Sequence, residues 1–318
     1  MNYILARVIR QFIPVVFIAS VAIFLLMELL PGDPAQIMLG PFGTNEQVEA
    51  LREEMGLNRP IHERYLLWLG DAVQGDFGRS VTGKTVRELI SSALPATLEL
   101  ALVAFLLGNL LGVMLGVVAG ITRGGWPDLL ISGVNGLLIA VPSFVAGLLY
   151  LLIFVVWLDV FPSAGRVPLL DDPWLALQHL ALPALALGGI ISAVIARFTR
   201  QSIVDTLSND YIRTARAKGL PERLVIIRHA LKPSMIPVVT VSGIQIGGLI
   251  GGTIVIERVF TWPGMGRVLV GAVDARDYNT IQAITLLLVI SYVFFNLMTD
   301  VLYGVLDPRV KVGRGVGA

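Results

Sequence analysis

The sequence predicts an all-α membrane protein with six transmembrane helices, and both its composition and its long apolar runs support this. Of the 318 residues, 55% are apolar and only 15% are charged, whereas soluble domains carry about 25% charged residues. A helix needs about 20 mostly apolar residues to cross a bilayer. Six runs meet this length, at residues 9–30, 96–121, 129–158, 180–198, 235–256 and 281–303.

The first run, residues 9–30, is long for a signal peptide, whose apolar region covers about 7–15 residues. No stretch of small residues typical of a cleavage site follows it. Residues 1–30 are therefore expected to form the N-terminus and an uncleaved first transmembrane helix.

Residues 31–95 are expected to form a small extracytoplasmic insertion between the first and second transmembrane helices. It opens with the turn-forming sequence Pro-Gly-Asp-Pro at 31–34, which ends the first helix. Two short helices are predicted inside it, at 45–56, where Asn45 is expected to cap the N-terminus, and at about 60–73.

Lysine and arginine predict the orientation, because cytoplasmic segments carry an excess of both. If the N-terminus is cytoplasmic, the inner segments with their flanking helix ends hold 14 Lys and Arg against five Asp and Glu. The outer segments hold 10 Lys and Arg against 15 acids. Both termini are therefore expected in the cytoplasm, together with the most basic segment, residues 199–234, which we call the basic loop.

The fifth run is rich in glycine, with Gly243, Gly247 and Gly251 spaced four residues apart. This spacing of small residues allows close contact between helix backbones. Two interpretations stay open: packing alone, or a helix that lines a pathway and moves against its neighbours. Prolines, which bend transmembrane helices, fall within or near the third to fifth runs at Pro142, Pro183 and Pro237.

The middle of each run lacks ionisable side chains. Carriers driven by protons or ions usually bury carboxylates or histidines there, so a stand-alone secondary carrier is disfavoured and energy is expected to enter through a partner. The chain has no cysteine, and its three histidines, His62, His179 and His229, are far apart in sequence. No metal, cofactor or catalytic site is therefore predicted.

Residues 78–85, Gly-Arg-Ser-Val-Thr-Gly-Lys-Thr, match the phosphate-loop pattern of nucleotide-binding proteins. That loop needs a buried strand before it and a helix after it, so that backbone amides meet the phosphates. The preceding Gln-Gly-Asp-Phe is no buried strand, and the segment is predicted to lie outside the cytoplasm. A turn in the outer insertion is expected here instead of a nucleotide site.

The basic loop is predicted to contain two helices joined by a tight turn. Asp210 is expected to cap a short helix at 211–218, and Gly219 suits the left-handed conformation that often ends a helix. Pro221 suits the first turn of the next helix. The basic side chains would pair with acids of a partner or with anionic lipid; an ordinary positive cytoplasmic loop is the plainer alternative.

The run from Tyr211 to Gly219 resembles the EAA loop of ABC-importer permeases, in the version of the dipeptide and oligopeptide branch. It keeps the alanine, glycine and leucine of the pattern as Ala215, Gly219 and Leu231. It departs from the general pattern, in ways usual for that branch, at Arg213, Thr214, His229 and Lys232.

Further motifs along the chain are similar to those of the same branch. Together they identify the chain as a member of the glutathione, dipeptide and nickel permease branch. The motifs are Leu-Pro-Gly-Asp-Pro at 30–34, Gly-Asp-Phe-Gly at 75–78, Phe-Thr-Trp-Pro-Gly-Met-Gly at 260–266, Arg-Asp-Tyr at 276–278 and Asp-Pro-Arg at 307–309.

The resemblance implies the type I permease fold, with a five-helix core at 96–318, in an ATP-driven importer of the bacterial inner membrane. The implied partners are a second, homologous permease, two cytoplasmic ATPase subunits, an extracytoplasmic substrate-binding protein and membrane lipid, but no nucleic acid. ATP hydrolysis would take place on the ATPases, so this chain is expected to be non-catalytic. The implied solutes are di- and oligopeptides, glutathione among them; nickel or another small solute is the alternative.

Two groups of site residues follow. The basic loop is expected to contact an ATPase and to move with it as a rigid lever, and the small Ala215 and Ala217 would let that partner approach. Its residues are Tyr211, Arg213, Thr214, Ala215, Arg216, Ala217, Lys218, Gly219, Leu220, Pro221 and His229. Polar residues in the spans are candidates for pathway lining, with hydrogen bonding between helices as the plainer role: Gln245, Asn109, Asn135 and Ser143.

Overall fold

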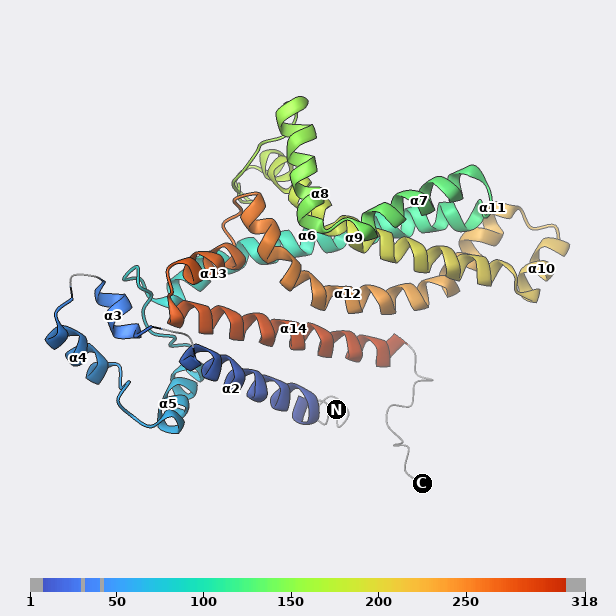
Figure 1. The fold of residues 1–318 in the computed structure, drawn as a ribbon. Helices are drawn as coiled ribbons and strands as arrows, with labels where there is room; N and C mark the ends of the chain where they lie inside the picture. Colours follow the sequence, from blue (N-terminus) through green and yellow to red (C-terminus); the bar gives the residue numbers. More distant parts are fainter. Residues whose placement is uncertain (1–7, 30–31, 41–42, 307–318) are drawn as a thin grey trace, which may run out of the picture. The chain divides into compact units, whose positions relative to one another are not determined.

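The computed structural model describes residues 8–29, 32–40 and 43–306. Within these ranges the chain is almost entirely helical (Figure 1), which confirms the predicted class, and its only bridge pairs Arg79 with Thr85. The described residues fall into two compact units. Unit 1 lies within 1–97 and 263–294, and unit 2 lies within 98–262 and 295–318.

Unit 1 contains the first span and the insertion that follows it. Its core is a cluster of apolar side chains that includes Val86, Met265 and Ile284. Its elements are η1 (Val8–Phe12), α2 (Ile13–Leu29), α3 (Pro34–Leu39), α4 (Asn45–Glu54), α5 (Ile61–Val73), the first part of α6 (Val86–Ile121), α13 (Met265–Asp274) and the first part of α14 (Tyr278–Leu306).

The short helices of the insertion begin where side chains satisfy their free N–H groups. The Asp33 carboxylate accepts the Ala35 N–H at 3.0 Å at the start of α3. Thr44, one residue before the predicted Asn45, caps α4, because its hydroxyl and the Gln47 side chain form a reciprocal capping box. The prediction of Asn45 as the cap is therefore wrong by one residue.

The insertion is attached to the first span through α5. Arg64 donates two hydrogen bonds to the Glu28 carboxylate, at 2.7 and 2.6 Å. The Tyr65 hydroxyl lies 2.8 Å from the Ser20 hydroxyl, and the Phe24 ring packs edge-on against the Tyr65 ring. One ion pair, one contact between hydroxyls and one aromatic cluster therefore attach α2 to the insertion.

Residues 78–85 form a turn in the insertion, as predicted. Ser80 donates its N–H to the Lys84 carbonyl at 2.9 Å. The Asp277 carboxylate, buried in unit 1, accepts the Val81 N–H at 3.3 Å and the Thr280 hydroxyl at 2.7 Å. One carboxylate thus holds the turn and the start of α14 together.

Unit 2 holds most of the membrane-spanning helices. In Figure 1, α7, α9 and α12 run beside one another within it, and contacts join α9 to both of the others. Its elements are the rest of α6, α7 (Trp126–Ala140), α8 (Ser143–Tyr150), η2 (Leu151–Trp157), α9 (Pro173–Leu207), α10 (Asp210–Ala217), α11 (Glu222–Leu224), η3 (Val225–Leu231), α12 (Lys232–Val259) and the end of α14.

The third predicted run, 129–158, is not one straight helix. It is divided into α7 and the α8–η2 segment, which are bent by 107°. Val141 is extended and Pro142 follows it, because a proline disfavours the helical conformation of the residue before it. Pro183 and Pro237, by contrast, lie inside the continuous helices α9 and α12.

A row of glycines brings α6 close to α9. A Cβ added at Gly108 would lie 2.7 Å from the Gly188 carbonyl oxygen, and one added at Gly116 would lie 2.5 Å from the Thr199 Cβ. Contacts this close leave no room for a methyl group. The same applies at two further glycines of the row, Gly112 and Gly120, which face Ile195 and Ile203.

The order of these contacts also shows how many times the bent pair, α7 with α8–η2, crosses the membrane. Contacts advance in the same direction along both helices, from Gly108 and Gly188 to Gly120 and Ile203, so α6 and α9 run parallel. The chain between two parallel spans must cross the membrane an odd number of times. The bent pair is therefore one crossing, which together with five continuous apolar helices makes six spans in the described residues.

The glycines of α12 have two kinds of surroundings. A Cβ at Gly243 would overlap the Thr299 side chain of α14. At Gly248 and Gly251, however, an added Cβ meets no atom within 4 Å. Within the described chain the close contact that the spacing allows is therefore made at Gly243 and not at Gly251, so packing and pathway lining both stay open for α12.

Candidate functional site

The basic loop begins as a continuation of α9, which stays helical through Leu207. The short helix α10 then covers Asp210–Ala217 with Asn209 at its N-cap, although no side chain bonds there. The prediction that Asp210 caps the helix is wrong by one residue. Asp210 lies in the first turn, where its negative charge still suits the helix N-terminus.

One face of α10 is buried against the returning chain. Ile212 and Val225 are fully buried, and Ala215 is 7% exposed in the same cluster. The prediction that Ala215 admits a partner surface is therefore wrong, because its methyl group packs inside the loop. Ala217 is exposed and remains available.

The turn after α10 depends on a glycine. Gly219 has φ +75°, a left-handed conformation that costs other residues roughly 1–2 kcal/mol. Pro221 follows as the N-cap of α11, one position before the first turn for which it was predicted. Arg216 donates two hydrogen bonds across this turn to Glu222, at 3.0 and 2.5 Å, and these bonds raise the pKa of Arg216.

The return to the membrane passes through the π-helix η3. Pro233 has no N–H to donate to the His229 carbonyl, so regular α-helical bonding is interrupted at this point. The fully buried Ser234 then donates to the Thr206 hydroxyl at 2.9 Å, and Ser202 donates to the Ser234 carbonyl at 3.0 Å. The two ends of the basic loop are thereby bonded to each other.

The other face of the loop is open to solvent. Leu220 and His229 are half-buried at its edge. A compact element with a dry inner face, two bonded ends and a polar outer face can transmit force between a partner and the spans. The exposed predicted residues are Tyr211, Arg213, Thr214, Arg216, Ala217, Lys218, Gly219 and Pro221.

A buried ion pair, not predicted as a site, lies near the end of unit 2 that carries the basic loop. Arg200 of α9 donates to both oxygens of Asp128 on α7, at 2.5 and 2.7 Å, and the Gly124 N–H donates to Asp128 at 2.9 Å. Asp128 is only 3% exposed. Its position in the first turn after Pro127 was the available sequence signal, but the sequence does not show which arginine it meets.

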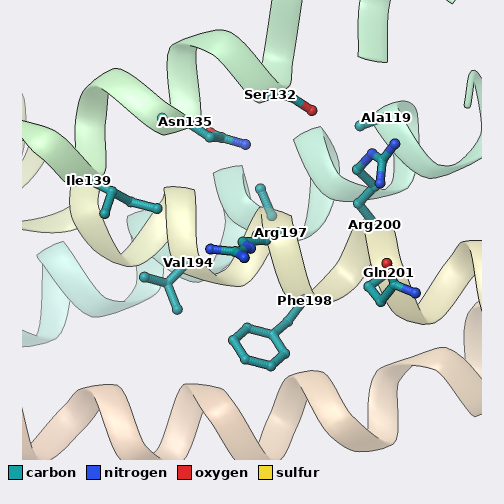
Figure 2. Close-up of a pocket in the computed structure, with 11 residues that line it drawn as sticks. Ala119, Ser132, Asn135, Ile139, Val194, Arg197, Phe198, Arg200 and Gln201 are labelled. Atoms are coloured by element: carbon teal, nitrogen blue, oxygen red, sulfur yellow. The ribbon is translucent and has the colours of Figure 1, made fainter. Parts of the chain in front are cut away.

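Next to this pair lies a cavity of about 900 Å³ between α6, α7 and α9. Figure 2 shows Ser132 and Asn135 on α7, and Arg197 and Phe198 on α9. Of the four residues predicted to line a pathway, the structure places only Asn135 in this cavity. Asn109 bonds back to the Phe105 carbonyl on α6; Gln245 lies on α12 and Ser143 begins α8.

Comparison with known proteins identifies the family. The family described as "Binding-protein-dependent transport system inner membrane component" matches residues 112–312, and its N-terminal part matches residues 1–101. The chain belongs to this family. The matched residues take in the basic loop and the motifs at 260–266 and 276–278, whereas the motif at 307–309 and the first two residues of that at 30–34 lie outside the described residues.

Relatives of this permease family match the chain over its length. The glutathione transport system permease protein GsiC of Escherichia coli strain K12 is 42% identical over 312 residues, which covers 98% of this chain and 99% of that protein. GsiC of Shigella dysenteriae serotype 1 matches with the same identity and coverage.

Solved structures confirm the permease fold. An inward-facing MetNI methionine ABC transporter matches with a TM-score of 0.56 at 17% identity, covering 69% of this chain and 96% of that chain. An amino acid ABC transporter with histidines matches with a TM-score of 0.52 at 16% identity, covering 68% and 93%. The chain is thus a transmembrane permease subunit of an ATP-driven ABC importer.

Proposed function

We propose that the basic loop receives the movement of a cytoplasmic ATPase and transmits it to the spans of this permease. The observation that carries the proposal is the division of the loop into two faces. Ile212, Ala215 and Val225 are packed inside, while Arg213, Lys218 and their neighbours are open to a partner. A partner pressing on the outer face would move α9 and α12 together, because Ser234 joins them.

The complete importer would contain a second, homologous permease, two ATPase subunits and an extracytoplasmic substrate-binding protein. This chain would hydrolyse no ATP itself. The excess of Lys and Arg supports a cytoplasmic location for both termini in the bacterial inner membrane. An even number of crossings, six, supports their location on one side.

The solute we propose is a di- or oligopeptide, with glutathione as the first to test. The support is the 42% identity to glutathione permeases over nearly the whole chain. Reconstituted complex, supplied with its binding protein and ATP inside liposomes, is expected to accumulate glutathione. Absence of uptake, in liposomes whose ATPase activity is intact, would exclude glutathione.

Replacing Gly219 with valine tests the loop. The left-handed conformation should resist the β-branched side chain, so the turn changes shape and ATPase co-purification is expected to fall about 5–30-fold. Glutathione uptake should fall with it. Retention of both at wild-type levels contradicts the role of the loop.

The matched control is Gly165→Val. Gly165 also has a positive φ, +90°, and an added Cβ there likewise meets no atom within 4 Å. It lies in the segment between η2 and α9, far along the chain from the basic loop. Backbone strain is thus matched, and ATPase co-purification with this variant is expected to equal that of the wild type.

A further inference from the structure

The facing sides of α7 and α9 carry a ladder of polar side chains. On α7, Asp128, Ser132 and Asn135 are spaced four and three residues apart and so share one face. On α9, Arg200 and Arg197 are three residues apart. The first rung is complete, because Asp128 and Arg200 neutralise each other.

One turn away on α9, Arg197 is an exposed cation with no anion beside it in the described chain. Arg197 lines the cavity, and no hydrogen bond or ion pair joins it to another described residue. Asn135 lines the same cavity and is 7% exposed, yet its Oδ1 atom has no hydrogen-bond partner in the described chain. A buried polar atom without a partner is unusual and calls for a specific reason.

The remaining polar groups of the cavity are already engaged. Ser132 donates to Asp128, and Gln201 donates to Asp205 at 2.9 Å. Ile139 and Phe198 supply apolar wall. The cavity therefore offers the exposed guanidinium of Arg197 and, once the Asn135 side chain rotates, its amide oxygen, in a volume within the roughly 300–1,000 Å³ range of small-molecule sites.

We propose that this cavity binds a carboxylate-bearing solute during its passage, with Arg197 pairing with the carboxylate and Asn135, whose buried amide oxygen turns toward the cavity, accepting an N–H of the same solute. The proposal rests on the proposed function, and peptides and glutathione carry both groups. A guanidinium binds a carboxylate through two parallel hydrogen bonds.

A phospholipid phosphate also carries negative charge, but the geometry favours a solute. Asn135 lies about 10 Å further along α7 than Asp128, toward the middle of the span. Headgroups lie at the membrane surface, so a lipid bound there would contact Arg197 without the Asn135 oxygen. The site we describe uses both groups.

The test compares glutathione with its diethyl ester, in which both carboxylates are neutral. Complete complex in liposomes is assayed as the wild type, Arg197→Gln, Arg197→Lys and the control Arg123→Gln, which removes an exposed arginine at 123 that lines no part of the cavity. The same binding protein serves every variant. Dividing the uptake of a variant by that of the wild type therefore removes the binding protein's own preference between glutathione and its ester. Arg197→Gln should lower the glutathione ratio about tenfold, Arg197→Lys should lower it less, and Arg123→Gln should leave it unchanged.

The ester ratio and the solute-free ATPase rate should stay at wild-type values in Arg197→Gln, which shows that folding and coupling are intact. Equilibrium dialysis of labelled glutathione against complex without binding protein should show the same loss of binding. This second measurement decides the matter if the ester is not taken up.

Three outcomes would overturn the proposal. Wild-type uptake and binding by Arg197→Gln would remove Arg197 from the pathway while the proposed function stands. An effect that appears only in liposomes with anionic lipid, equal for glutathione and ester, would identify a lipid headgroup site. Absence of glutathione uptake by the wild type would reject the proposed solute and this use of the cavity with it.

Discussion

The two glycine-rich helices of unit 2, α6 and α12, use glycine for different ends. In α6, Gly108 and Gly116 belong to a row in which every added methyl group would collide with α9. In α12, methyl groups added at Gly248 and Gly251 would meet no atom of the described chain within 4 Å. The first row fixes two spans to each other, whereas the second leaves a helix face smooth and unfilled. Glycine content alone therefore does not distinguish a rigid contact from a free surface.

The largest effect is expected where the glycine row is tightest. Gly116→Ala places a methyl group 2.5 Å from Thr199 Cβ and 2.6 Å from the Ala196 carbonyl oxygen. Backbone cannot move aside cheaply, so overpacking should cost about 3 kcal/mol. The Tm of the purified subunit, followed by fluorescence-detected size exclusion, should drop by several degrees. An unchanged Tm would contradict the claim that the α6 glycines, unlike Gly248 and Gly251 of α12, are in tight contact with a neighbouring helix.

A smaller effect is expected at Gly243 of α12, where an added methyl group would overlap a side chain on α14. The nearest atom is the Thr299 methyl, so Gly243→Ala should cost about 1 kcal/mol. Thr299→Ser removes that methyl but keeps the hydroxyl that donates to the Gly243 carbonyl at 2.8 Å. The double variant should therefore recover most of the Tm lost, and absence of recovery would place the clash elsewhere.

The smallest effect, with the opposite sign, is expected at Gly248. Alanine there meets no neighbour and restricts the unfolded chain, so Gly248→Ala should stabilise the subunit by about 0.5–1 kcal/mol. The same thermal melt measures it. If the isolated subunit gains stability while glutathione uptake by the complete complex falls, the face of α12 that carries Gly248 takes part in transport.

The sequence predicted the class, the six spans and the basic loop because these depend on features local to the chain. Apolar length reveals a span, and a glycine followed by a proline reveals the turn at Gly219. The bend at Pro142 was also visible, although its angle was not. These features need no knowledge of a distant neighbour.

Pairwise features escaped prediction. Gly108 and Gly112 have the same four-residue spacing as Gly247 and Gly251, yet only the structure shows which glycines meet a neighbouring helix. Ala215 and Ala217 are alike in sequence, and packing alone decides that the first faces inward. The partner of Asp128 lies 72 residues away along the chain, and nothing local to either residue identifies it.

The bond between the turn at residues 78–85 and Asp277 has a consequence for biosynthesis. Val81 and Asp277 are separated by 196 residues, and a ribosome adds about 5–20 residues per second. The turn must therefore wait on the order of ten seconds or more for the carboxylate that holds it. Unit 1 can be completed only late in synthesis, because its two stretches, 1–97 and 263–294, are separated in the chain by residues 98–262. A chain truncated before Asp277 would therefore leave the insertion unfinished.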